Sequence, residues 1–305
     1  MDLSDFKEYI LQHRPQLKDN SARTYALSLK SLAPPGATDF AWVSDVDYVL
    51  GAIEKFKDTT RKNCLNAVIV VLEKGSDAFT KYTEERDKYN QLYAEHNKAR
   101  KKTESQEKNW VEWPEYLEMV KKLGRETKNL HKDLSKREMF RLQDYLLVLL
   151  HSHYPLRNNF ADVKVISHAE FKRLTPAQKE EQNYLVQKNK QYSLILNEYK
   201  TSKKYGEKTI EMNSKVTPVI RRWLTHNRSG YLLVDSADPS KPLGSNGTSK
   251  TFARIGMREL GRRLGSSLLR HSYLSHKYGE DAIEKEKDAD LMMHSVAMQD
   301  GYIKK

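Results

Sequence analysis

The hydrophobic pattern of this chain changes period once, and that change restricts the fold more than any other feature. Apolar residues recur with helical spacing over most of the 305 residues, whereas the segment 189–199 alternates with period two, as a strand does. A glycine-containing turn at 202–208 follows, and 209–212 is expected to return as a second strand. Residues 231–234 fit a short third strand. The order of elements is therefore helices, a small antiparallel hairpin and helices again. This order predicts a mainly helical α+β fold.

The composition divides the chain into three parts. Residues 1–75 predict a small helical domain, and residues 76–108, which lack proline and glycine and are rich in charge, predict a helical linker. Residues 109–305 predict a second domain built around a buried helix at 140–150. The helices expected from the apolar spacing are 6–17, 21–32, 46–56, 60–72, 215–224, 249–264, 267–278 and 281–293.

The charge favours a polyanionic partner. Lysine and arginine total 53 against 41 acidic residues, which gives a net charge of +12, and nucleic acid is the expected partner of such a surplus. The single cysteine, Cys64, excludes an internal disulfide and any cysteine-based zinc site, and its apolar surroundings indicate a core thiol. No apolar run approaches the roughly 20 residues that span a bilayer. The acidic N-terminus does not resemble a signal peptide, so an intracellular protein is expected.

The C-terminal segment carries residues suited to phosphoryl transfer. Arg270 lies near the start of an expected helix, His294 follows downstream, and Tyr302 lies eight residues beyond that histidine. An arginine can hold two phosphate oxygens at once, and a histidine can donate to a third. A tyrosine hydroxyl can attack phosphorus and form a covalent ester. Tyr273 and Tyr278, on the same helix as Arg270, are expected to pack instead.

This order of residues resembles the catalytic domain of the tyrosine recombinase (phage-integrase) family. The resemblance implies that Arg157, which follows the buried helix, is the first catalytic arginine and Arg270 the second. It also implies that Lys200, on the hairpin, is the general acid, in preference to Lys203 and Lys204. His294 and Tyr302 then correspond to the third-box histidine and the nucleophile.

Two departures from the family pattern bear on activity. The second box usually reads His-x-x-Arg, and here Ser267 stands at the histidine position. Either the serine contacts phosphate more weakly, or His271 replaces it, or catalysis is lost; we expect His271 to be structural and to lie on a different helix face from Ser267. The spacing from His294 to Tyr302 is eight, where the family usually has nine.

The resemblance implies a site-specific DNA recombinase that cuts and rejoins duplex DNA through a 3′-phosphotyrosyl bond, without metal or cofactor. Residues 1–75 would be the core-binding domain, with positive charge from 18–25, Lys55, Lys57, Arg61 and Lys62. A homotetramer on DNA is expected, and a monomer or weak dimer in free solution. The segments 104–111 and 157–159 resemble recombinases of eukaryotic large DNA viruses and their satellite viruses, which implies a nuclear or viral replication compartment. Only three residues follow Tyr302, so either another element, such as the helix at 76–108, couples the protomers, or the chain is truncated. With so short an anchor, we expect the Tyr302 region to be mobile without DNA.

Three other interpretations stay open at the level of sequence. A type IB topoisomerase uses the same residues, and a DNA-binding protein with weakened catalysis would account for Ser267. His151 and His153 beside Tyr154 also fit a metal-dependent relaxase, although the expected buried helix would make the two histidines diverge.

Overall fold

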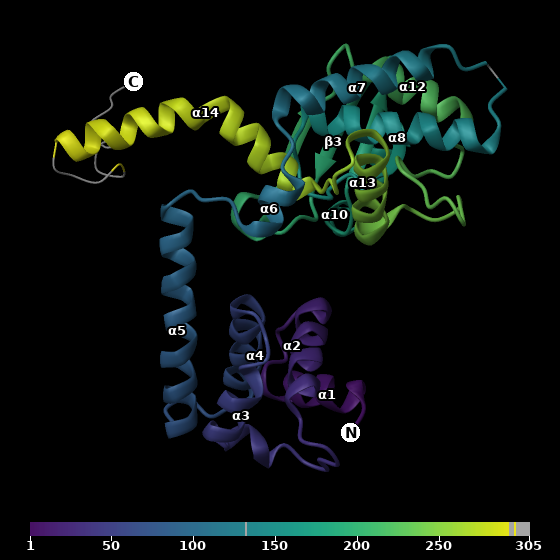
Figure 1. The fold of residues 1–305 in the computed structure, drawn as a ribbon. Coiled ribbons are helices and arrows are strands. Elements are labelled where there is room, and N and C mark those ends of the chain that lie inside the picture. The colour runs from purple at the N-terminus through teal and green to yellow at the C-terminus, as the bar shows by residue number, and fades with distance from the viewer. Residues whose placement is uncertain (132, 293–295, 297–305) are drawn as a thin grey trace. The chain divides into compact units, whose positions relative to one another are not determined.

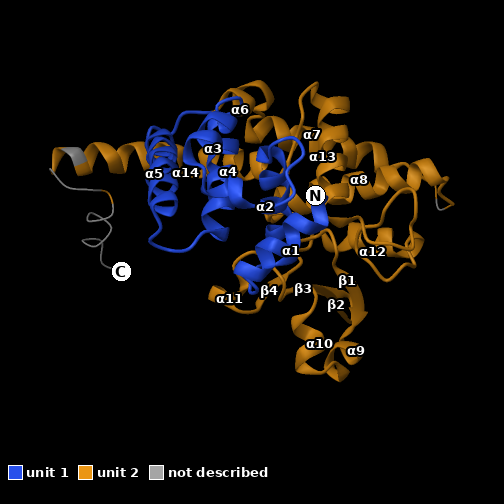
Figure 2. Cartoon of the chain, turned by 90° about the horizontal axis from the view of Figure 1, so that it is seen from below, with its two compact units in different colours: residues 1–102 blue, residues 103–305 orange. Residues whose placement is uncertain are grey.

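The computed structural model describes residues 1–131, 133–292 and 296. The chain forms two compact units, residues 1–102 and 103–305 (Figure 2). The predicted α+β class is confirmed, because the chain is mostly helical with one small sheet. Within the described part of the chain, no helix is both long and apolar enough to cross a membrane.

The first unit is a helical bundle centred on its fourth helix. Its elements are α1 (Leu3–His13), α2 (Asp19–Leu32), η1 (Ala41–Ser44), α3 (Val46–Ile53), α4 (Asp58–Val71) and α5 (Asp77–Lys98). Helix α4 packs against α1, α2 and α5, and its apolar residues are buried nearly all round. Cys64 is fully buried there, which confirms the predicted core thiol.

Helix α5 covers most of the predicted linker, and its first turns belong to the first unit. Ala78 and Tyr82 are buried in the core of that unit. The Tyr82 hydroxyl lies 3.1 Å from the carbonyl oxygens of both Val43 and Asp45. The boundary between the two units lies between Lys102 and Thr103, within the segment predicted as a linker.

The second unit packs helices around a four-stranded sheet (Figure 1). Its helices are α6 (Glu104–Asn109), α7 (Trp113–Lys128), α8 (Lys136–His153), α9 (His168–Arg173), α10 (Pro176–Glu180), α11 (Ser202–Tyr205), α12 (Thr217–His226), α13 (Gly244–Leu260) and α14 (Ser266–Leu291). Its strands are β1 (Lys164–Ser167), β2 (Tyr184–Lys188), β3 (Gln191–Leu196) and β4 (Lys208–Glu211). Helix α8 contacts α7, α12 and α13.

The sheet is mixed and larger than the predicted hairpin. Its order is β1-β2-β3-β4, with β1 and β2 parallel and the other neighbours antiparallel. The expected hairpin corresponds to β3 and β4, whereas β1 and β2 were not predicted. The segment 231–234 is no strand, since only Tyr231 and Val234 form isolated bridges while Leu232 and Leu233 enter the core.

Helix α14 replaces the two helices expected at 267–278 and 281–293. It runs without a break from Ser266 to Leu291 and passes through Gly279. A glycine inside a helix costs only about 1 kcal/mol relative to alanine, so it does not have to end one.

Candidate active site

Helix α8 positions the loop that carries Arg157. Residues 146–151 near its end are buried in the core, and the helix ends at His153. The N–H of the next residue, Tyr154, donates to the carbonyl oxygen of Leu150 at 2.7 Å. Pro155 follows and cannot continue the helix. The Tyr154 hydroxyl accepts from the N–H of Asn213 at 2.8 Å and donates to the carbonyl oxygen of Glu211 at 3.0 Å. Arg157 is therefore an exposed side chain on a loop anchored to rigid structure.

His151 supports the same loop from inside the protein. Its side chain is fully buried, with Nδ1 at 3.0 Å from the carbonyl oxygen of Leu147 and Nε2 at 3.3 Å from that of Arg157. The rings of Phe160 and Phe252 pack edge-on against it. Burial lowers the pKa of His151 to about 4, against the hydrogen bonds to the two carbonyls, which raise it. The ring is thus neutral at physiological pH.

Asn158 connects the loop to two other helices. Its Nδ2 lies 3.1 Å from the carbonyl oxygen of Ser245, 3.0 Å from the Ser245 hydroxyl and 3.1 Å from the Ser249 hydroxyl, both at the start of α13. Its Oδ1 accepts from the Ser266 hydroxyl at 2.7 Å, in the first turn of α14. One amide side chain thus fixes the Arg157 loop against the first turns of α13 and α14.

Arg270 lies in the second turn of α14, close to Arg157. Its pKa is lowered first by burial and then by the positive charge of Arg157, and the charge of Arg270 in turn helps to lower the pKa of His151. Among the described residues, neither guanidinium forms an ion pair with a carboxylate. Two neighbouring arginines without an acidic partner form a site suited to an anion. The structure thus brings together the two arginines that the sequence motifs single out.

The second-box candidates Ser267 and His271 both lie on α14 and are exposed. They are four residues apart in one continuous helix, so they share a face, and the expectation of different faces was wrong. Ser266, one residue earlier, makes the hydrogen bond to Asn158. Ser267 therefore contributes no hydrogen bond within the described part of the chain, which leaves its hydroxyl free for a ligand.

Lys200 lies on the hairpin formed by β3 and β4. It is exposed in the connection between β3 and β4, directly before the short helix α11. Within the described residues its ammonium group makes no hydrogen bond or ion pair. Lys203 is also exposed, and Lys204 lies over the ring of Tyr205 at 5.2 Å.

The remaining predicted residues, His294 and Tyr302, lie outside the described residues. Of the competing tyrosines, Tyr273 packs as expected, with its ring 5.1 Å from that of Trp113. Tyr278 does not pack, because 47% of it is exposed. In the first unit, Arg61 was expected to contact DNA. Its guanidinium donates hydrogen bonds to the carbonyl oxygens of Phe56 and Glu54, so part of its hydrogen-bonding capacity stabilises the fold.

The histidines of the relaxase alternative are not arranged as a metal-binding pair. His151 and His153 lie on helix α8 and not on a strand, and both ring nitrogens of His151 face backbone carbonyl oxygens. Within residues 1–131, 133–292 and 296, no group of three or more His, Cys, Asp or Glu could hold a metal ion.

Sequence reasoning missed the residues that support the arginines. The sequence offers only the adjacency of Asn158 to Arg157 as a signal, because the serines that Asn158 contacts are 87 to 108 residues away. His151 was considered only as a metal ligand. Its position inside an apolar helix was the signal that it could be a buried support.

No protein-family model matches the chain, and no curated protein matches it.

Proposed function

We propose that the protein is a tyrosine-type DNA strand transferase acting as a site-specific recombinase. The observation that carries the proposal is the pair Arg157, on the loop after α8, and Arg270, on α14. The charge of Arg157 acts on Arg270, and neither has a carboxylate partner in the described residues. A diester phosphate is the anion that fits a DNA partner, and the net charge of +12 favours such a partner. Residues 1–102 would form the core-binding domain and 103–305 the catalytic domain.

In the proposed reaction, Arg157 and Arg270 bind the non-bridging oxygens of the scissile phosphate. The Tyr302 hydroxyl attacks phosphorus and releases its proton to water, so that a tyrosyl 3′-phosphate bond forms. The bond to the 5′ oxygen breaks, and Lys200 donates a proton to that oxygen. His294 would help to stabilise the five-coordinate transition state. Attack by a 5′ hydroxyl on the phosphotyrosine then rejoins the DNA and restores the tyrosine.

A suicide DNA substrate tests the proposal. The protein is incubated in EDTA with nicked duplexes from which the cleaved 5′ end diffuses away, and covalent adducts are separated in denaturing gels. We expect an adduct with the wild type and none with Tyr302→Phe. Arg270→Gln should slow its formation by about 100-fold or more, because it removes two charge-assisted hydrogen bonds. Arg228→Gln, which removes an exposed charge elsewhere in the same unit, is the matched control. Absence of the adduct in wild type, or its persistence in Tyr302→Phe, would overturn the proposal.

Ser267 supports a second candidate, a DNA-binding protein with weakened catalysis. Its exposed hydroxyl stands where the family pattern has a histidine, and it is four residues from His271 on the same face. The variant Ser267→His distinguishes the candidates, since it should speed adduct formation if serine limits the rate. Relaxation of a supercoiled plasmid that holds a single site would instead indicate the topoisomerase activity that uses the same residues.

A further inference from the structure

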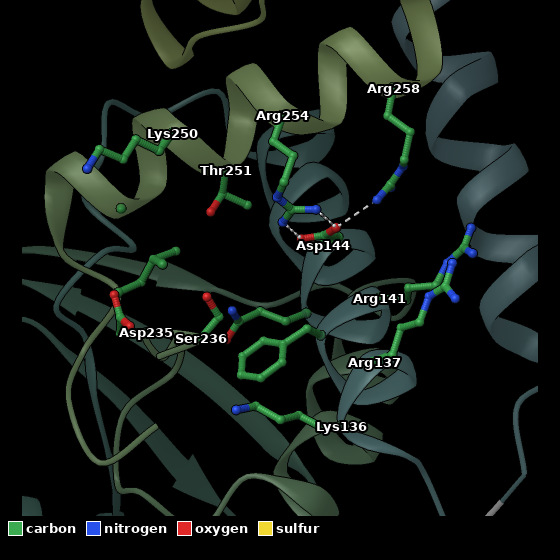
Figure 3. A pocket seen from close by; sticks show the side chains of 14 residues that line it. Lys136, Arg137, Arg141, Asp144, Asp235, Ser236, Lys250, Thr251, Arg254 and Arg258 are labelled. Atoms are coloured by element: carbon green, nitrogen blue, oxygen red, sulfur yellow. Dashed lines mark hydrogen bonds and ion pairs between the residues drawn. The ribbon is translucent and has the colours of Figure 1, made fainter. Parts of the chain in front are cut away.

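A pocket lies in the second unit between the first half of α8 and helix α13. Its volume is about 490 Å³, which is within the range of small-molecule sites. Side chains from α8, from α13 and from the loop after Val234 line it (Figure 3). Of the described residues that the proposed reaction uses, Arg157, Lys200 and Arg270 do not line this pocket.

The two carboxylates of the pocket each have hydrogen-bond partners within the protein. Asp144 is buried, and its two oxygens accept from Arg254 at 2.6 and 2.8 Å, while Arg258 lies at 3.3 Å (Figure 3). The Asp235 carboxylate accepts from the backbone N–H groups of Ala237 and Asp238 at 2.7 and 3.1 Å. The charge of Asp144 is therefore balanced by two arginines, whereas Asp235 keeps its negative charge.

Arg254 is an oriented donor at this pocket. A guanidinium has five N–H groups, and the buried carboxylate of Asp144 engages one on each terminal nitrogen. The side chain is 53% exposed, so the remaining donors are open to a ligand. An arginine held in plane by a buried acid loses little further freedom when it binds, which favours affinity.

Lys136 and Lys250 add two ammonium groups from opposite walls. Lys136 begins α8 and Lys250 lies one turn before Arg254 on α13 (Figure 3). Within the described residues neither lysine forms an ion pair. Six basic and two acidic side chains line the pocket, so positive charge is in excess there, and an anion would relieve that repulsion.

The uncharged residues that line the pocket indicate a ligand with apolar and hydrogen-bonding groups as well as negative charge. Phe140 and Leu243 contribute apolar surface, and Ser236 and Thr251 contribute hydroxyl groups. We propose that the pocket binds a nucleotide, with its phosphates at Lys136, Lys250 and Arg254 and its base against Phe140 and Leu243. The nucleotide comes either from free solution or from an unpaired end of a nucleic acid strand. This inference does not rest on the proposed recombinase reaction.

Isothermal titration of the full chain at fixed salt tests it. The ligands are ATP, AMP, adenosine and inorganic pyrophosphate, together with a DNA hairpin whose end is blunt or carries one unpaired adenosine. We expect one ATP bound per chain if the source is free nucleotide, and preference for the unpaired end if the source is DNA. In either case adenosine alone should bind much more weakly, because it lacks the phosphates.

Three variants decide between a nucleotide pocket and a general positive surface. Lys136→Gln with Lys250→Gln should weaken binding by about tenfold or more through the loss of two charge-assisted contacts. Lys188→Gln with Lys190→Gln, two exposed lysines on the β2–β3 hairpin, is the matched control and should leave binding unchanged. Ser236→Trp fills the pocket without changing charge and should abolish binding; its thermal unfolding is compared with wild type to establish that it folds.

The proposal is overturned if neither ATP nor the unpaired end binds more tightly than pyrophosphate. It is equally overturned if the control pair weakens binding as much as the pocket pair, or if a folded Ser236→Trp binds as wild type does. All three results are independent of whether Tyr302 forms a DNA adduct, so failure here and failure of the proposed reaction are distinguishable.

Discussion

His151 should make the stability of the second unit depend on pH. Its ring is fully buried between Phe160 and Phe252, and burial lowers its pKa from 6.5 to about 4. The folded-state pKa is below the unfolded value, so protons bind preferentially to the unfolded chain. The neutral ring therefore makes its full contribution to the free energy of unfolding above about pH 6.5, and this contribution is lost as the pH falls towards about 4.

The size of the effect follows from the same pKa difference. At pH 5 an unfolded imidazole is almost fully protonated while the buried ring is still mostly neutral. The linkage relation then gives a loss of about 2 kcal/mol between pH 8 and pH 5 from this single side chain. The loss comes from burying the charged ring, because protonation itself would make Nε2 a donor to the carbonyl oxygen of Arg157 and strengthen that contact.

Urea unfolding at pH 8, 6 and 5 measures the effect in wild type and in His151→Gln, whose amide is uncharged at every pH. Both are made in a Trp42→Phe background, so that the fluorescence of Trp110, Trp113 and Trp223 reports on the second unit. Other titrating groups cancel in the difference between the two proteins. The free energy of unfolding of wild type, relative to that of His151→Gln, should be about 2 kcal/mol lower at pH 5 than at pH 8. Parallel curves for the two proteins, or a His151 ring that titrates near pH 6.5 by NMR, would refute the reasoning.

Three further outcomes are expected. Asn158→Ala should destabilise the second unit by about 1–2 kcal/mol in urea unfolding and slow adduct formation, because it removes the hydrogen bonds to Ser245, Ser249 and Ser266; Asn159→Ala is the neighbouring control. Gly256→Ala should lower the free energy of unfolding by about 2 kcal/mol or more, because its Cβ would lie 2.7 Å from the backbone nitrogen of Leu264. The Cβ of Gly279→Ala would meet nothing within 4 Å, so this variant should raise the free energy of unfolding by about 0.5–1 kcal/mol. DNA affinity, measured by fluorescence anisotropy, should fall with salt by about 0.9 log units per log unit of salt for each phosphate neutralised, and a flat salt dependence would contradict a backbone-contacting protein.

Local sequence pattern predicted the helices well where one face is apolar and failed where tertiary contacts decide. The stretch 60–72 became α4 (Asp58–Val71), and 140–150 lies within α8. Strands β1 and β2 are only four and five residues long and are separated by α9 and α10, so their parallel pairing leaves no short-range signal. The segment 231–234 has a strand-like composition, but its backbone pairs only at isolated bridges and its side chains fill the core.

The candidate site could also be predicted only in part from the sequence. Arg157 and Arg270 could be found from sequence because each lies in a short motif beside a helix end. The residues that support the two arginines could not be found in this way. They are Asn158, whose amide joins three segments, and His151, whose role is set by its burial. A buried neutral imidazole and a four-contact asparagine carry no charge themselves, yet they bring two like charges together and keep them there. A bound phosphate would accept from both guanidinium groups, so we propose that the supporting residues and the two arginines act as one anion-binding unit.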